Sequence, residues 1–134
     1  MKFSNGLWLE KEGYQVFSPK EVYSADITEN SITIYAPFVH VAHRGNTTDG
    51  GLMTITLRAL ASNVISVSVT NHKGSRKKDA HFAISSRPTS TQVYETEDTF
   101  VLASGSMEAH ISKASWQISY YNDPILLTST SANA

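Results

Sequence analysis

Histidines are the residues of this 134-residue sequence that first suggest metal or acid–base chemistry, because there are five of them. His40 and His43 form an H-x-x-H pair, a spacing that places two imidazoles on one face of a helix. The segment around them instead has the pattern of a strand leading into a loop, and Asp49 is nearby without an obvious third ligand. We therefore predict no metal site and no cofactor. We expect histidines that face solvent or make a single hydrogen bond, His72 and His110 included.

Nucleophilic and carboxylate catalysis find no better support. Cysteine is absent, which excludes thiol catalysis, and no serine lies in a G-x-S-x-G elbow. Glu95, Glu97 and Asp98 crowd one short segment, but three acids beside a strand are typical of an exposed turn that discourages edge pairing. A glycine-rich phosphate loop is also missing, since the DGG of 49–51 is read as a turn. We predict no catalytic residue within this sequence.

Three aromatic residues near the end of the sequence keep carbohydrate binding open as a function. Trp116, Tyr120 and Tyr121 are candidates for a platform on which a sugar ring stacks. Successive side chains of a strand point to opposite faces, so Trp116 and Tyr120 share one face and Tyr121 occupies the other. One of these two sets is therefore expected to belong to the core.

Charge and hydropathy argue against two classes of partner. Eleven basic and twelve acidic side chains leave a net charge of −1, so neither nucleic acid nor an anionic membrane is expected to bind. The basic cluster KGSRKK (73–78) lacks interleaved aromatic residues and is read as a solvated loop. The first residues show no apolar signal-peptide core, and no stretch approaches the roughly 18 apolar residues of a membrane span. We expect a cytoplasmic protein, which suits a sequence without cysteine.

The elements that position these residues are strands, because the dominant period of the sequence is two. Apolar and polar side chains alternate in SITIYAP (31–37), GLMTITLRAL (51–60) and NVISVSVTN (63–71). Further strands are expected at 14–17, 21–27, 81–85, 91–96, 99–103, 107–113, 116–121 and 125–128. No window of 11 residues has the period of an amphipathic helix. Short strands between Gly-, Pro- and Asn-containing breaks predict one all-β domain, an antiparallel sandwich or barrel.

The stretch SGSMEAHISKASWQISYYNDPILLTS (104–129) resembles the N-terminal region of family 31 glycoside hydrolases. In that family a strand of the pattern G-x-L-x-x-x-I-S-K-x-x-W-x-I-x-F precedes a turn and a second strand, x-x-L-L-T-x-S. The matching positions here are Ile111, Ser112, Lys113, Trp116, Ile118, Leu126, Leu127, Thr128 and Ser129. Three further segments are similar to the α-xylosidase branch: MKFSNGLWL (1–9), YAPFVHVAHRGNTTDGGLMTITL (35–57) and ISVSVTNHKG (65–74).

This resemblance implies a fold and a division of labour. It implies an antiparallel β-sandwich of the galactose-mutarotase-like (supersandwich) type, with residues 1–134 as a single, partial N-terminal domain of a longer glycosidase. The partner of this domain would be a catalytic (β/α)8 barrel that hydrolyses α-glycosidic bonds of a carbohydrate substrate with retention, using two aspartates. The chain itself would be a non-catalytic domain that supports the barrel and the subunit contacts of a homo-oligomer. A free-standing carbohydrate-binding sandwich is the alternative.

The resemblance also points to one loop. In α-xylosidase-type relatives a loop of the sandwich can lean over an active site, sometimes that of a neighbouring subunit. The segment from Val41 to Gly51 matches this loop by position, so Asp49, together with Arg44, is the candidate for contact with a sugar hydroxyl. An ordinary hairpin loop without a ligand is the competing interpretation.

Overall fold

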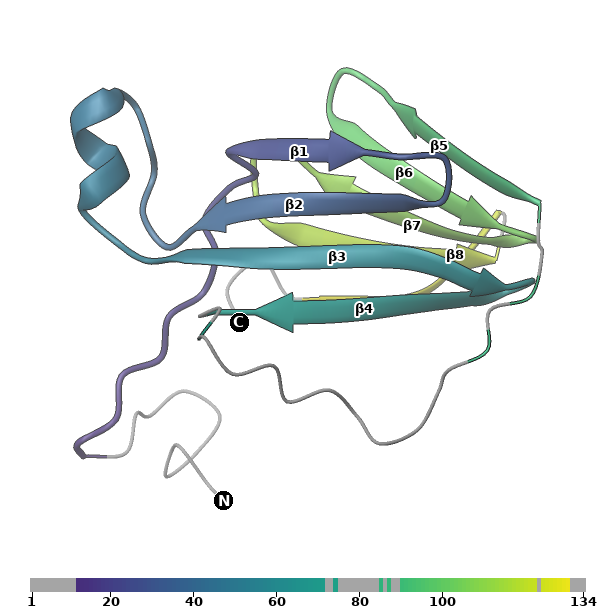
Figure 1. Cartoon of the computed structure of the whole chain (residues 1–134), viewed down its shortest axis with the longest axis horizontal. Helices are drawn as coiled ribbons and strands as arrows, with labels where there is room; N and C mark the ends of the chain where they lie inside the picture. Colours follow the sequence, from purple (N-terminus) through teal and green to yellow (C-terminus); the bar gives the residue numbers. More distant parts are fainter. Residues whose placement is uncertain are drawn as a thin grey trace.

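Two antiparallel sheets form the protein, whose computed structural model describes residues 12–71, 74, 85, 87, 90–122 and 124–130. The first sheet contains β1 (Ser24–Ile27), β2 (Ser31–Pro37), β3 (Leu52–Ala61) and β4 (Val64–Thr70). The second contains β5 (Thr91–Glu95), β6 (Thr99–Ser104), β7 (Met107–Ser112), β8 (Gln117–Asn122) and β9 (Ile125–Ser129). In each sheet every strand pairs with the next one along the chain, and Figure 1 shows the sheets as two layers. The predicted all-β sandwich is confirmed, whereas its galactose-mutarotase-like type stays a prediction.

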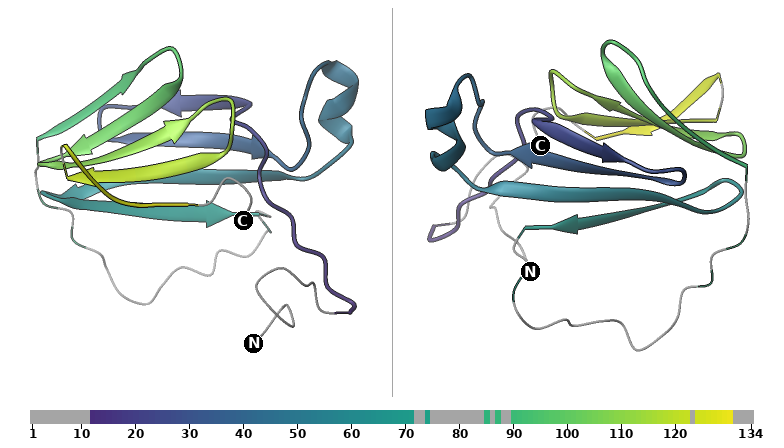
Figure 2. Two further views of the ribbon diagram at one scale, coloured as in Figure 1. Left: turned by 180° about the vertical axis from the view of Figure 1, so that it is seen from behind. Right: turned by 45° about the horizontal axis from the view of Figure 1, so that its top comes forward.

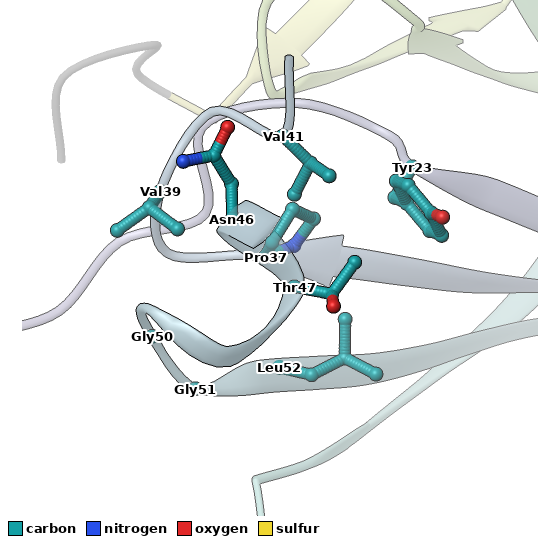
Figure 3. A pocket seen from close by; sticks show the side chains of 9 residues that line it. All are labelled: Tyr23, Pro37, Val39, Val41, Asn46, Thr47, Gly50, Gly51 and Leu52. Atoms are coloured by element: carbon teal, nitrogen blue, oxygen red, sulfur yellow. The ribbon is translucent and has the colours of Figure 1, made fainter. Parts of the chain in front are cut away.

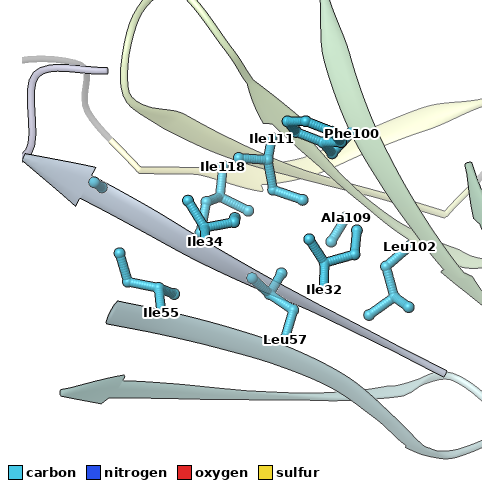
Figure 4. Close-up of a cluster of buried hydrophobic side chains, with 10 residues drawn as sticks. Ile32, Ile34, Ile55, Leu57, Phe100, Leu102, Ala109, Ile111 and Ile118 are labelled. Atoms are coloured by element: carbon cyan, nitrogen blue, oxygen red, sulfur yellow. The ribbon is translucent and has the colours of Figure 1, made fainter. Parts of the chain in front are cut away.

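The core lies between the sheets because alternate residues of the central strands point inward. Figure 4 shows the side chains of the first sheet facing those of the second, and the core they form contains Ile32, Ile34, Ala36, Ile55, Leu57, Phe100, Leu102, Ala109, Ile111 and Ile118. Fully burying one aliphatic side chain of this size contributes roughly 1.5–3 kcal/mol. Thr33 and Thr56 alternate with these residues, and their hydroxyls lie 3.3 Å apart. The period-two expectation therefore holds for β2 and β3.

Two hairpin turns fasten the sheets to each other at one end of the sandwich. Asn63, in the turn after β3, donates its N–H to the carbonyl of Ser104 over 3.0 Å, and its Oδ1 accepts from the N–H of Ser106 at 2.8 Å. The buried hydroxyl of Ser104 donates to the carbonyl of Ala61 at 2.7 Å. Asn63 and Gly105 have φ angles of 60° and 65°, a region that asparagine and glycine adopt at low cost. These residue types therefore set both turns and the link between them.

The edge strands β4 and β9 expose apolar side chains. β3 packs on β6, and β4 packs on β7. The second sheet therefore has two more strands, β8 and β9, beyond the edge of the first sheet at β4. Val67 and Val69 pair with the inward-facing Leu57 and Ile55, yet both are more than 40% exposed. Residues 125–127 of β9 are more than half exposed. Neither strand contains a charged residue, whereas the other two edges carry Asp26 in β1 and Glu95 in β5.

One of the predicted strands is wrong, and another lies almost entirely outside the described residues. The strand predicted at Tyr14–Phe17 is wrong, because these described residues form no strand. The strand predicted at 81–85, the basic cluster at 73–78 and His72 lie outside the described residues, apart from Gly74 and Ser85. The one helical segment among the described residues is a short 3₁₀ helix, η1 (Arg44–Thr48). In the part of the chain that the structure describes, no helix is long and apolar enough to cross a membrane.

Candidate functional site: the β2–β3 arm

Residues 38–51, which we term the β2–β3 arm, connect β2 to β3 and project beyond the end of the first sheet, as Figure 2 shows. At its base the Phe38 N–H donates to the carbonyl of Gly51 at 3.0 Å. The ring of Phe38 stacks on Phe17, with centroids 5.6 Å apart. At Gly51, the residue before β3, a Cβ would lie 2.9 Å from two ring carbons of Phe38, so any other residue there would force this ring to move. The arm therefore has a packed base.

Glu21 clamps the arm from the segment that precedes β1. Its Oε1 accepts the N–H of Val41 at 2.8 Å, and its Oε2 lies 2.9 Å from Nδ1 of His40. The hydrogen bond with His40, followed by that from Val41, holds the pKa of the Glu21 carboxyl below its usual value. The ionised carboxylate is thus the form that holds the arm.

The tip of the arm is a closed hydrogen-bonded turn. His43 caps η1: its Nδ1 accepts the N–H of Gly45 at 3.1 Å, and its own N–H donates to Oδ1 of Asn46 at 3.3 Å. The hydroxyl of Thr47 donates to the carbonyl of Arg44 at 2.8 Å, and that of Thr48 donates to the carbonyl of Gly45 at 3.2 Å. From the sequence, the polar residues of this stretch suggest an ordinary loop. In the structure their side chains form hydrogen bonds with the backbone of the turn.

The structure places Arg44 and Asp49 at opposite ends of η1. Both side chains are exposed. The amide Nδ2 of Asn46 donates to Oδ2 of Asp49 at 2.8 Å, which fixes the carboxylate without using both of its oxygens. An exposed guanidinium and an exposed, oriented carboxylate on one turn can donate to and accept from the hydroxyls of a sugar.

A small pocket lies between the arm and the first sheet. It has a volume of about 130 Å³ and is lined by Tyr23, Pro37, Val39, Val41, Asn46, Thr47, Gly50, Gly51 and Leu52. Figure 3 shows the ring of Tyr23 on one side of it, facing the arm residue Thr47 and Leu52 of β3. Its lining is mainly aliphatic and aromatic. Asp49 and Arg44 do not line it, so the pocket and the two candidate residues are separate features of the arm.

Each of the three histidines in the described part of the chain makes a single side-chain hydrogen bond, as the sequence predicts for such residues. His40 contacts Glu21, His43 caps η1, and Nε2 of His110 lies 2.7 Å from Oε2 of Glu108. Among the described residues no group of three or more His, Cys, Asp or Glu side chains is placed to hold a metal ion.

The aromatic residues divide as expected between core and surface. Trp116 and Tyr120 pack against the core, and burial raises the pKa of the Tyr120 hydroxyl. Tyr121 lies on the opposite face of β8, where its ring centroid is 4.7 Å from that of His110. The core set is therefore Trp116 and Tyr120, both of which are partly buried against the core.

Sequence reasoning missed two anchoring residues. Glu21 is 19 residues from His40, so no local pattern could pair them. Lys113, known from the sequence only as part of a motif, donates from Nζ to Oε1 of Glu95 at 2.8 Å and to the carbonyl of Glu97 at 3.1 Å. It also lies 4.9 Å from the centroid of the Phe100 ring. The motif lysine thus holds the acidic turn between β5 and β6.

Comparison with known proteins connects the chain to a curated α-xylosidase. The chain is 34% identical over 108 residues to the alpha-xylosidase XylQ of Lactiplantibacillus pentosus. The matched region makes up 81% of this chain but spans only 14% of the length of XylQ. No protein-family model matches the chain. The similarity to XylQ confirms the family resemblance that the sequence motifs indicate.

Proposed function

We propose that residues 1–134 form a non-catalytic N-terminal β-sandwich domain of a longer glycoside hydrolase of the α-xylosidase type. The observation that carries this proposal is the 34% identity to XylQ over most of this chain, within a small part of the relative. In the proposed enzyme the rest of the polypeptide supplies a (β/α)8 barrel, which binds the carbohydrate and hydrolyses its α-glycosidic bond. The cytoplasm is the proposed compartment, in keeping with the cysteine-free sequence.

The contacts of the acidic side chains support a structural role for this domain. Glu21 holds the β2–β3 arm, Glu95 bonds to Lys113, and Glu108 bonds to His110. A retaining glycosidase needs two carboxyl groups about 5–5.5 Å apart on either side of the scissile bond. Each of these three acids instead has a basic partner within this domain, namely His40, Lys113 and His110, which suits a domain that leaves catalysis to the barrel.

The proposed contribution to substrate binding comes from the β2–β3 arm. Asp49 and Arg44 would meet a sugar hydroxyl at the mouth of a barrel, in the same subunit or in a neighbouring subunit of the homo-oligomer. Their exposure at the tip and the hydrogen bonds that order η1 support this assignment. An ordered arm is suited to this task because less conformational entropy is lost when the sugar binds.

A chimera tests the domain assignment. The matched segment of XylQ would be replaced by this chain, and hydrolysis of p-nitrophenyl α-D-xyloside compared with that of XylQ lacking the segment. We expect activity in the chimera, none in the deletion variant, and none in the 134-residue chain alone. Hydrolysis by the isolated chain would contradict the non-catalytic role. Sequencing the gene beyond the codon for Ala134 is the direct companion experiment, and a stop codon there would contradict the longer enzyme.

The arm is tested in the same chimera. Asp49→Ala should lower kcat/KM roughly 10- to 100-fold, the range expected for a lost hydrogen bond to a charged group. Asp98→Ala, which removes an exposed acid from the turn between β5 and β6, is the matched control and should leave both constants unchanged. If Asp49→Ala leaves both kcat and KM at their original values, the arm does not touch the substrate.

A further inference from the structure

We propose that the outer face of the second sheet, across β5 to β8, is a binding site for a neutral saccharide. This site goes beyond the proposed function, because a domain that supports a barrel needs no sugar ligand of its own. It is also separate from the β2–β3 arm, which belongs to the first sheet. Its principal residues are Tyr94, Glu108, His110 and Tyr121.

The register of the strands brings these residues into two adjacent rows. One row across the sheet runs Tyr94, Val101, His110, Ser119, and the next runs Gln92, Ala103, Glu108, Tyr121. Residues of one strand that are two apart share a face, so both rows lie on the face opposite the core residues Leu102 and Ala109. The two tyrosines therefore stand at diagonal corners, on β5 and β8, with roughly 14 Å of sheet between these strands at about 4.8 Å per strand. That width suits two or three sugar rings.

Between Tyr94 and Tyr121, the central residues of the two rows on β6 are small or medium-sized and apolar. Val101 is 1% exposed and Ala103 is 9% exposed, although both lie on the outer face of the sheet. Their cross-strand neighbours are larger, so the side chains of Tyr94 on one side and of His110 and Glu108 on the other form the accessible surface. Tyr94 is 42% exposed, so part of its side chain lies at the surface of this face.

The polar groups at the centre form an oriented pair. Nε2 of His110 lies 2.7 Å from Oε2 of Glu108, and the His110 ring packs on Tyr121 with 4.7 Å between centroids. The side chains of His110 and Glu108 are 31% and 25% exposed, so both reach the surface. A carboxylate accepts hydrogen bonds at both oxygens, and an imidazole has a second ring nitrogen. The pair can therefore bind neighbouring hydroxyls while each group keeps its partner.

The chemistry of the face selects the class of ligand. Aromatic rings bind the apolar C–H surface of a sugar, and a few fixed polar groups then set its orientation, as in small-ligand sites generally. The two rows contain one carboxylate and no Lys or Arg, which disfavours phosphorylated and acidic sugars by charge repulsion. A neutral saccharide is the ligand that matches both the rings and the charge.

Nuclear magnetic resonance of the 15N-labelled 134-residue chain tests this site. Titration with methyl α-D-xylopyranoside, and separately with methyl α-D-glucopyranoside, should shift the amide signals of 92–94, 101–103, 108–110 and 119–121. Tyr121→Ala should weaken binding about three- to tenfold, as expected for loss of an aromatic contact. Tyr35→Ala, which removes a tyrosine from the outer face of the first sheet, is the matched control and should bind as the unchanged chain does.

Glu108→Gln provides a second test that preserves side-chain size. It should weaken binding in a protein whose spectrum shows an unchanged fold. No shifts with either glycoside, shifts confined to the β2–β3 arm, or equal affinity of the Tyr121→Ala, Glu108→Gln and unchanged chains would each overturn the site. The XylQ chimera is scored by hydrolysis alone, so failure of this site and failure of the accessory-domain role are distinguishable.

Discussion

Gly105 is the residue at which a single methyl group should be most damaging. It has a φ of 65°, and a Cβ there would lie 2.6 Å from Oγ of Ser62 and even closer to Oδ1 of Asn63. Gly105→Ala should therefore lower the free energy of unfolding by about 2 kcal/mol or more, from backbone strain and the clash together. Urea denaturation followed by circular dichroism measures this change.

Gly13 is a matched control for this prediction. Its φ is 83°, but a Cβ there would meet nothing within 4 Å. Gly13→Ala should cost only the backbone strain, on the order of 1 kcal/mol. Equal effects of the two substitutions would show that the contact between the two turns contributes nothing to stability.

Lys113 gives a second prediction at the scale of the residue. Its side chain is 24% exposed, and its ammonium group donates to Glu95 and to carbonyls of the acidic turn. Lys113→Met keeps most of the aliphatic stem but removes the donor, so it should lower the free energy of unfolding by about 1–2 kcal/mol. Lys20→Met, at an exposed position, is the control for loss of one positive charge. If Lys113→Met lowers the free energy of unfolding no more than Lys20→Met does, the acidic turn does not depend on the hydrogen bonds of Lys113.

At the scale of the elements, the stability of the protein in acid depends on the contact between the β2–β3 arm and the segment before β1. Glu21 makes this contact. Its pKa is lower in the folded protein than in the unfolded chain, since the bonds from His40 and Val41 favour the carboxylate. Its contribution to stability is therefore present above the unfolded pKa and is lost as the pH falls through the folded pKa. Glu21→Gln should flatten the decline of the melting temperature as the pH falls from 5 to 3, values that bracket the usual pKa of about 4.3.

The control for this experiment is Glu29→Gln, which removes an exposed acid from the turn after β1. It should leave the acid limb of the curve as steep as in the unchanged chain. If Glu21→Gln does the same, the clamp does not hold the arm in solution.

Elements also show how far the sequence could predict the fold. The alternation in β2 and β3 was sufficient, because both strands have a neighbour on each side and one face in the core. In β4 the same alternation identified the inward valines but not their exposure, since an edge position depends on pairing with distant strands. Tyr14–Phe17 has strand-like residues but forms no strand, because β-propensity reflects the packing of neighbours that a local window does not contain.

The candidate site was predicted by position only. Arg44 and Asp49 came from the resemblance, and nothing in their residue types indicated a 3₁₀ turn between them. The turn depends on side-chain bonds from His43 and Asn46, and the base of the arm depends on Glu21, far away in sequence. Interactions of this kind are specified by the folded chain as a whole.

At the scale of the whole molecule, the two uncharged edges predict self-association. Natural sheets usually protect their edges with charged residues, and β4 and β9 have none. The 134-residue chain should therefore form dimers or larger assemblies at high concentration. Static light scattering measures this, and a monomer at every concentration would contradict the prediction.

Charged substitutions test which edges are responsible. Val69→Lys in β4 and Leu127→Lys in β9 change exposed side chains and should shift the assembly towards the monomer without loss of fold. Ser24→Lys, on the edge strand β1 that already carries Asp26, should leave the molar mass unchanged. An equal effect of all three substitutions would point to net charge rather than to the two edges.

Each sheet is built from one unbroken run of sequence, β1 to β4 and then β5 to β9. Among the residues that the structure describes, no strand of one run pairs in the sheet of the other, so the boundary between the two layers is also a boundary along the sequence. Two separately expressed pieces, one ending after Thr70 and one beginning before Thr91, would each contain a full set of pairing partners. Their union would depend on the core, on the contact between the turns at Asn63 and Gly105, and on the backbone hydrogen bonds that join residues 20–22 to residues 113–116. The domain is therefore a natural scaffold for split-protein complementation, in which recovery of a folded sandwich reports that two fused partners have met.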